Sequence, residues 1–225
     1  MHIPDGFVSG GVNAAAGALS LGVCGLALAR AEKTLGDKQV PLLGVTAAFV
    51  FAAQMINFPV AGGTSGHFLG ALLAAVLLGP LNAFLVLAVV LVIQCLLFAD
   101  GGITALGTNI FNMGIVGGLG GYCVFRMLLF ILPRGRAAFL SAAAVAAWLS
   151  VVLASFCCAV ELGVSGTSPL AIAVPAMCGV HAITGIGEAL ITAAVLSTVL
   201  AARPDLVGAW QPPNGARLPE ALANG

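Results

Sequence analysis

The first two residues of the chain combine nitrogen donors that suit a transition-metal ion. The sequence begins Met1-His2, and a turn-forming Pro-Asp-Gly group follows at residues 4–6. Because a methionine followed by a bulky residue is normally retained, we expect Met1 to keep a free α-amine. That amine, the backbone nitrogen of His2 and Nδ1 of its ring can bind one ion through fused five- and six-membered chelate rings. Nitrogen-rich ligation suits nickel, copper and cobalt, and a tetragonal arrangement favours Ni(II) or Cu(II).

A second histidine follows a polar, glycine-rich segment. Residues 57–67 read Asn-Phe-Pro-Val-Ala-Gly-Gly-Thr-Ser-Gly-His and end at His67. Since glycine permits the backbone of tight turns, we expect this segment to be a loop at the end of an apolar run. The alternative role for His67 is a loop histidine bonded to the backbone. Together with the N-terminal pair, metal ligation is the favoured interpretation, and the expected ligands are Met1, His2 and His67.

Polar side chains in two loops are candidates to support those ligands. Residues 100–109 form a second polar segment that contains an aspartate and an asparagine. Carboxylate and amide oxygens can accept hydrogen bonds from ligand imidazoles and fix their tautomers. The alternative is a solvated loop whose side chains satisfy turn backbone. The candidates for this supporting role are Asn57, Ser65, Asp100 and Asn109.

The last apolar run contains the third histidine and a glutamate. His181 and Glu188 are seven residues apart, so they lie on one face of a helix. Ionisable residues inside a membrane segment are candidates for function. The pattern leaves three roles open: the two residues could flank the ion path, pack against a partner subunit, or pair with each other.

The composition places all of these residues in a membrane protein. Apolar residues make up 60% of the chain and charged residues 7%, and the mean hydropathy is +1.13, which excludes an ordinary soluble domain. The runs are continuously apolar and do not alternate, so we predict an all-α, polytopic transmembrane bundle. The run 67–79 is short for a full crossing. About seven spans are expected, at 11–30, 41–58, 67–79, 81–98, 110–132, 137–160 and 171–201.

The basic residues predict the orientation of the bundle. With seven crossings all eight lie on one side, which the positive-inside rule makes cytoplasmic. The N-terminus and the loops that carry the site are then outside, and the C-terminus is cytoplasmic. No secretory signal pattern precedes the site. We expect a single transmembrane domain over 1–202 and a mobile cytoplasmic tail over 203–225. The basic residues are Arg30, Lys33, Lys38, Arg126, Arg134, Arg136, Arg203 and Arg217.

Small residues on the first run allow close helix packing. Ala14, Ala18 and Gly22 recur at four-residue spacing, and such residues let helices approach closely. They could serve packing within the chain or form a docking face for another membrane subunit.

Four motifs together resemble the CbiM/NikM family, the metal-specific substrate-binding (S) subunits of energy-coupling-factor importers for cobalt and nickel. The resemblance covers roughly residues 1–200, with the motifs in the same order. The motifs are Met1-His2-Ile3-Pro4-Asp5-Gly6, Ala61-Gly62-Gly63-Thr64-Ser65-Gly66-His67, Asp100-Gly101-Gly102-Ile103-Thr104-Ala105-Leu106-Gly107 and His181-Ala182-Ile183-Thr184-Gly185-Ile186-Gly187-Glu188.

The resemblance implies a seven-helix subunit of a prokaryotic cytoplasmic (inner) membrane that binds Ni2+ or Co2+ as the transported substrate. It implies near-planar nitrogen coordination by the residues that match here, Met1, His2 and His67. It also implies three kinds of partner: a transmembrane coupling (T) subunit, cytoplasmic ABC-type ATPases and a small auxiliary membrane subunit. No phosphate-binding loop occurs in the chain, so ATP hydrolysis would come from the partners.

Two other function classes remain open. An S subunit for an organic vitamin would need aromatic residues around a roomy cavity, and the sequence has only two Trp and one Tyr. A rhomboid-like intramembrane serine protease is suggested by the Gly-x-Ser-Gly patterns at 63–66 and 163–166, with His181 as the base. Both serines fall in expected outer loops, and such short patterns recur by chance in glycine-rich membrane chains.

Overall fold

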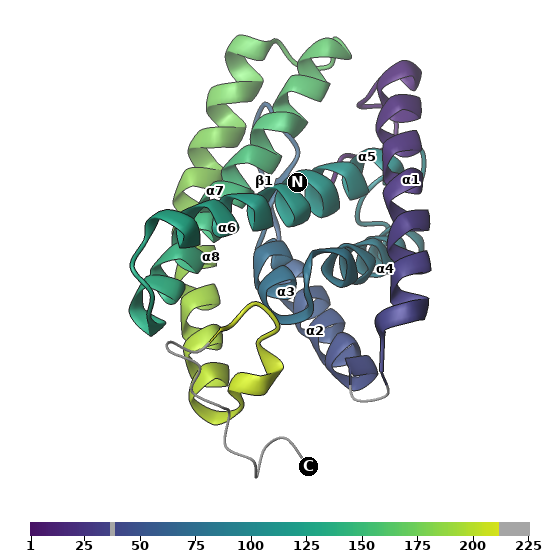
Figure 1. The fold of residues 1–225 in the computed structure, drawn as a ribbon. Coiled ribbons are helices and arrows are strands. Elements are labelled where there is room, and N and C mark those ends of the chain that lie inside the picture. Colours follow the sequence, from purple (N-terminus) through teal and green to yellow (C-terminus); the bar gives the residue numbers. More distant parts are fainter. Residues whose placement is uncertain (37–38, 212–225) are drawn as a thin grey trace.

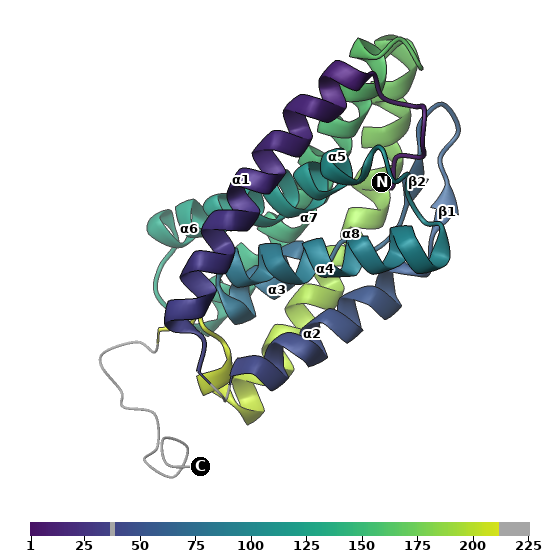
Figure 2. The ribbon, with the colours of Figure 1, turned by 90° about the vertical axis from the view of Figure 1, so that its right-hand side faces the viewer.

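Helices form in every apolar run of this computed structural model, which describes residues 1–36 and 39–211. The all-α bundle predicted from composition is confirmed (Figures 1 and 2). Five helical stretches within the described ranges are long and apolar enough to cross a membrane. The helices are α1 (Gly10–Thr34), α2 (Gln39–Gln54), α3 (Ala71–Leu78), α4 (Pro80–Phe98), α5 (Leu106–Ile110), the π-helix η1 (Phe111–Gly120), α6 (Gly121–Ile131), α7 (Arg136–Val164), α8 (Leu170–Ala202) and the 3₁₀-helix η2 (Pro204–Leu206).

The second and third runs are shorter as helices than expected. Helix α2 ends at Gln54, and the chain then forms an antiparallel hairpin of β1 (Phe58–Pro59) and β2 (Ser65–Gly66). Residues 67–70 continue without helical structure, and α3 begins only at Ala71. Glycine turns cause both changes, since Gly62 in the hairpin and Gly70 before α3 have φ of +76° and +72°. His67 therefore lies in a linker and not at the start of a helix.

The run expected at 110–132 is helical but not a uniform α-helix. It comprises α5, η1 and α6 without a break, and η1 is a ten-residue π-helix. Glycines in η1 admit neighbouring side chains to the backbone: a Cβ at Gly114 would lie 2.9 Å from the ring of Phe84, and one at Gly117 would lie 2.7 Å from Leu69. Close packing of this helical run against Phe84 and Leu69 thus depends on its glycines.

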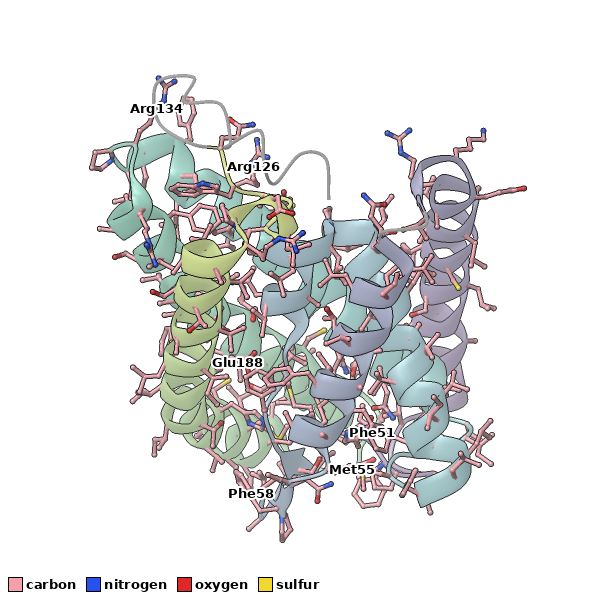
Figure 3. The ribbon with its side chains drawn as sticks, turned by 90° about the horizontal axis from the view of Figure 1, so that it is seen from below. Phe51, Met55, Phe58, Arg126, Arg134 and Glu188 are labelled. Carbon is pink, nitrogen blue, oxygen red and sulfur yellow. The ribbon has the colours of Figure 1, made fainter. Side chains whose placement is uncertain are left out.

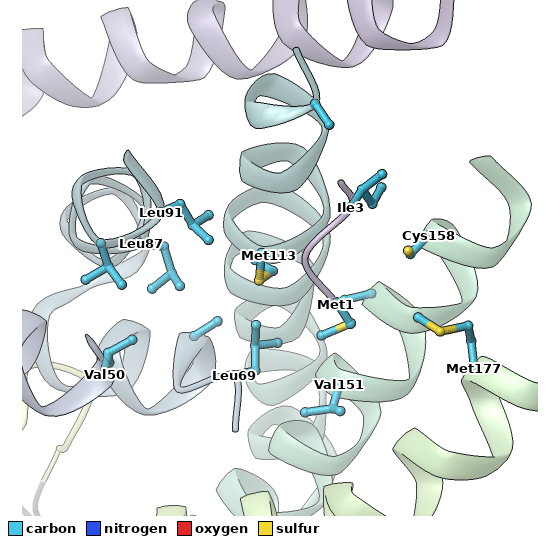
Figure 4. Close-up of a cluster of buried hydrophobic side chains, with 14 of the residues drawn as sticks. Met1, Ile3, Val50, Leu69, Leu87, Leu91, Met113, Val151, Cys158 and Met177 are labelled. Atoms are coloured by element: carbon cyan, nitrogen blue, oxygen red, sulfur yellow. The ribbon is translucent and has the colours of Figure 1, made fainter. Parts of the chain in front are cut away.

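The chain start lies in the hydrophobic interior and not on the surface. Met1 and Ile3 are fully buried, and they belong to the same apolar cluster as Met113 and Met177 (Figure 4). Long helices α7 and α8 run side by side and form one wall of this interior (Figures 1 and 2). The short α3 is buried over residues 71–77. The fold therefore holds the N-terminal nitrogens in a closed environment.

Basic residues and the hairpin lie at opposite ends of the molecule. Figure 3 shows Arg126 and Arg134 at one end and Met55 and Phe58 at the other. This separation is what the positive-inside argument requires, while the number of crossings and the orientation remain predictions. Lys38, Arg217 and residues 212–225 of the expected tail lie outside the described residues.

The first residues of the expected tail pack against the bundle. Val207 is buried, and the Gly208 N–H donates to the Leu77 carbonyl of α3 at 3.0 Å. The ring of Trp210 meets that of Phe139 edge-on, with centroids 4.9 Å apart. This part of the chain is thus continuous with the helical domain.

Helix α1 contacts α5 through residues other than the small ones singled out above. Ala14, Ala18 and Gly22 are exposed. The close approach is instead made by Gly17, because a Cβ on Gly107 of α5 would lie 2.6 Å from its Cα. Packing within the chain does not account for the Ala14–Gly22 face.

Candidate metal centre

Hydrogen bonds from two neighbouring segments fix the N-terminal residues. The Ser65 hydroxyl oxygen accepts from the Met1 amine at 2.9 Å and from the His2 backbone N–H at 3.0 Å. The next residue is held by α5, because the Asn109 amide accepts from the Ile3 N–H at 2.8 Å and donates to its carbonyl at 3.2 Å. Ser65 and Asn109, two of the expected supporting residues, thus hold the backbone.

The structure brings the three predicted ligands together. The His2 and His67 rings stack with centroids 4.6 Å apart and an interplanar angle of 30°. Nδ1 of His67 lies 2.7 Å from the Phe68 carbonyl, a contact that requires a proton on Nδ1 and leaves the lone pair on Nε2. Both His2 ring nitrogens and His67 Nε2 are buried without a hydrogen-bond partner in the described chain. Buried nitrogens in this state are costly unless they bind a ligand.

Asp100 and Asn57 lie beside the outer edge of His2. Asp100 Oδ2 is 3.7 Å from His2 Nε2, too far for a hydrogen bond, and it accepts from the Asn57 amide at 2.8 Å. Gly101 makes room on the Nδ1 side, since a Cβ there would lie 3.4 Å from His2 Nδ1. The carboxylate is therefore close to Nε2, and Nδ1 faces a residue without a side chain.

Burial keeps the nitrogen donors neutral. It lowers the pKa of the Met1 amine to about 5. Burial, and then the charge of that amine, lower the pKa of His2 to about 3 and hold the pKa of His67 well below its usual value. Burial raises the pKa of Asp100, and the nearby amine opposes this shift. At neutral pH the amine and both imidazoles thus carry free lone pairs.

A cleft of about 490 Å³ opens beside the site. Its lining includes His2, the hairpin-region residues Asn57 and Ser65, and the carboxylates of Asp5 and Asp100. Asp5 itself is held by the 99–105 loop, because its Oδ1 accepts from the Thr104 N–H at 2.7 Å and from its hydroxyl at 2.6 Å. The lining of this cleft thus includes two carboxylates together with the His2 imidazole.

His181 and Glu188 do not pair with each other. Nδ1 of His181 bonds to the Met177 carbonyl of its own helix at 2.7 Å, and its Nε2 is buried without a hydrogen-bond partner among the described residues. Glu188 accepts from the backbone N–H groups of Leu69 and Gly70. One of the three roles left open by the sequence, mutual pairing, is excluded by these contacts.

Sequence reasoning missed residues whose role depends on packing. The described residues hold no group of three or more His, Cys, Asp or Glu side chains placed to bind a metal. Gln54 donates to the Leu69 carbonyl at 2.7 Å, and Asp5 and Gly101 shape the cleft. The turn-forming Pro-Asp-Gly sequence could have indicated Asp5 as a candidate. Gln54 lies in an apolar run, and nothing in that run's sequence marks it as a functional residue.

Comparison with known proteins decides the family. The family described as the cobalt uptake substrate-specific transmembrane region, CbiM, matches residues 2–206. The chain belongs to the CbiM family. The chain is also similar to a solved structure: a crystal structure titled as a truncated transition metal transporter superposes with a TM-score of 0.84 and 36% identity, covering 89% of this chain and 99% of that one.

Two curated relatives carry names for different metals. A protein of Archaeoglobus fulgidus, provisionally named a fused nickel transport protein NikMN, is 44% identical over 209 residues, which is 92% of this chain and 68% of that protein. The cobalt transport protein CbiM of Kyrpidia tusciae is 38% identical over 146 residues, 64% of this chain and 59% of its own length. The relatives of this CbiM-family chain are thus metal transport proteins, named for nickel in one case and cobalt in the other.

Proposed function

We propose that this CbiM-family protein is the substrate-binding (S) subunit of an ATP-driven importer of the energy-coupling-factor type. It captures Ni(II) or Co(II) at the outer face of a prokaryotic cytoplasmic membrane. The four donors are the Met1 amine, the His2 backbone nitrogen, His2 Nδ1 and His67 Nε2. The observation that carries the proposal is the buried stack of His2 on His67, with ring nitrogens that have no hydrogen-bond partner in the described chain.

The contacts around the donors suit this chemistry. Ser65 already accepts hydrogen bonds from both backbone donors. Both hydrogen bonds direct these nitrogens at one point, so a metal would take the His2 lone pair that faces Ser65, the amide proton would pass to solvent and the hydroxyl would move aside. Asp100, 3.7 Å from His2 Nε2, favours a proton on that atom and thereby leaves Nδ1 for the metal. The lowered pKa values of the amine and imidazoles reduce competition by protons.

Transport requires partners, since the sequence has no phosphate-binding loop. The family resemblance supports assembly with a transmembrane coupling (T) subunit, ABC-type ATPases and a small auxiliary membrane subunit. In this scheme the chain supplies recognition, and the partners supply the energy for release on the other side.

The two alternatives have less support from the site. Both serine hydroxyl oxygens of the protease patterns accept hydrogen bonds from the N-terminal segment: Ser65 from Met1 and His2, and Ser165 from the Ser9 N–H at 2.9 Å. For an organic vitamin, the cleft lining contains Phe58 but neither Trp nor Tyr, and most of its other residues are small or polar. A small hydrated cation fits this lining better than a large planar ligand does.

The test is elemental analysis of the purified full-length chain with an unmodified N-terminus. Stoichiometric nickel or cobalt is expected in the wild type and in His181→Ala, because His181 is not among the four donors. His67→Ala should lose high-affinity capture, because only the three nitrogens of Met1 and His2 remain. If His181→Ala removes the metal and His67→Ala does not, the ion binds deeper in the bundle and this assignment is wrong.

A further inference from the structure

A four-residue linker, residues 67–70, carries His67 between strand β2 and helix α3. Its residues are buried except Phe68, which is half-buried, and its third residue, Leu69, is held from two sides. The Leu69 N–H donates to Oε2 of Glu188 on α8 at 2.7 Å, and the Leu69 carbonyl accepts from Gln54 Nε2 on α2 at 2.7 Å. The Gly70 N–H donates to Oε1 of Glu188, also at 2.7 Å. The linker is thus fixed to two helices that come from distant parts of the chain.

Glu188 uses both carboxylate oxygens in these contacts. Its side chain is buried, and Figure 3 places it on α8 between the two ends of the molecule. The two N–H groups directly precede α3, whose N-terminal cap is Gly70. An anion there interacts favourably with the positive end of the helix dipole, and hydrogen bonds to a charged acceptor are roughly twice as strong as neutral ones. The anchor is therefore stronger than an ordinary pair of loop hydrogen bonds.

The anchored backbone also sets the orientation of the imidazole. His67 Nδ1 bonds to the carbonyl of Phe68, the residue directly before Leu69. We propose that Glu188, assisted by Gln54, is a positioning residue for metal capture: it holds the 67–70 linker so that His67 Nε2 points at the nitrogens of Met1 and His2. This inference rests on the proposed function, because it concerns the same site.

Glu188→Gln is the informative substitution. A glutamine of nearly the same shape presents one acceptor oxygen and one NH2 group, so one of the two N–H donors loses its partner and faces another donor. The matched control is Glu161→Gln on α7. Glu161 is also buried, but its Oε2 accepts a hydrogen bond from the Asn112 side chain, which a glutamine oxygen can still accept.

The experiment is a double-mutant cycle on the full chain with an unmodified N-terminus. Nickel affinity is measured by competition with a chelator for the wild type, Glu188→Gln, His67→Ala and the double variant. Glu188→Gln alone should weaken binding about 10- to 100-fold, the usual effect of a group that orients a metal ligand. In the His67→Ala background the same substitution should change affinity by less than about twofold, because there is no imidazole left to position. Glu161→Gln should leave affinity unchanged.

The remaining outcomes separate the inference from the proposed function. An equal loss in both backgrounds overturns positioning through His67 and makes Glu188 a general structural residue; no loss in either overturns it as well. If the wild type binds no nickel, or His67→Ala binds as tightly as the wild type, the proposed function itself fails. Should Glu188→Gln not fold, Gln54→Met replaces it in the cycle, because it removes only the donor to the Leu69 carbonyl. Gln54→Met must then weaken nickel binding in the wild-type background and leave it unchanged in the His67→Ala background.

Discussion

Burial changes the acid–base behaviour of the proposed nitrogen ligands. With ordinary values near 8.0 for the Met1 amine and 6.5 for His2, capture would weaken steeply below about pH 6. In the folded protein the pKa values are lowered to about 5 and about 3, so both groups are neutral at pH 6–8 and neither releases a proton when it binds a metal. Only the His2 amide proton is then displaced by the metal.

The predicted pH profile follows from the release of this single amide proton. Between pH 6 and 8, nickel affinity should rise about tenfold per pH unit, because one proton is released for each ion bound. The dependence should steepen only as the pH falls through about 5, where the amine becomes protonated. Calorimetric titration in buffers of different ionisation enthalpy measures the number of protons released. A release of two or more protons near pH 7 would show that the donors keep ordinary pKa values.

At the scale of elements, the contact of α1 with α5 connects the transmembrane helices to the site. Ser20 of α1 donates to the Gly107 carbonyl at 2.8 Å, and Gly107 is two residues from Asn109, which binds the backbone of Ile3. Because a Cβ at Gly107 would lie 2.6 Å from the Gly17 backbone, no side-chain movement can relieve the contact. A change there should separate the two helices.

Gly107→Ala is therefore expected to destabilise the protein by about 1–3 kcal/mol, the usual cost of overpacking. The measurement is thermal unfolding of the purified chain in detergent. Gly22→Ala is the matched control on α1, because nothing lies within 4 Å of its added Cβ; it should be neutral or stabilising by up to about 1 kcal/mol. Equal melting temperatures for the two variants would contradict the proposed importance of this contact.

At the scale of the whole molecule, the buried chain start limits what can precede it. Met1 is fully buried and its amine bonds to Ser65, so an added residue has no space and also converts the amine to an amide. An extra alanine or a tag before Met1 should reduce nickel affinity more than tenfold, about 1.4 kcal/mol. Retained tight binding by the extended protein, compared with one tagged only at the C-terminus, would argue against the amine as a ligand.

The separation of the basic residues from the hairpin predicts the membrane orientation. With Arg126 and Arg134 at the opposite end from Phe58, the positive-inside rule places the N-terminal site outside and the C-terminus in the cytoplasm. A C-terminal fusion to a fluorescent protein should be fluorescent, and a fusion to alkaline phosphatase should be inactive. Active phosphatase would reverse the orientation and put the cleft on the cytoplasmic side.

The sequence by itself determined what depends on neighbouring residues. Continuous apolar runs predict helices because a spanning segment must satisfy its own backbone hydrogen bonds, and Met1-His2 predicts a chelate because its three nitrogens are adjacent in the chain. Only the tertiary structure decided which distant groups meet. Ile3 and Asn109 are 106 residues apart, and Leu69 and Glu188 are 119 apart. Their hydrogen bonds exist because helix packing brings the segments together, and burial of the chain start, which lowers its pKa values, follows from the same packing.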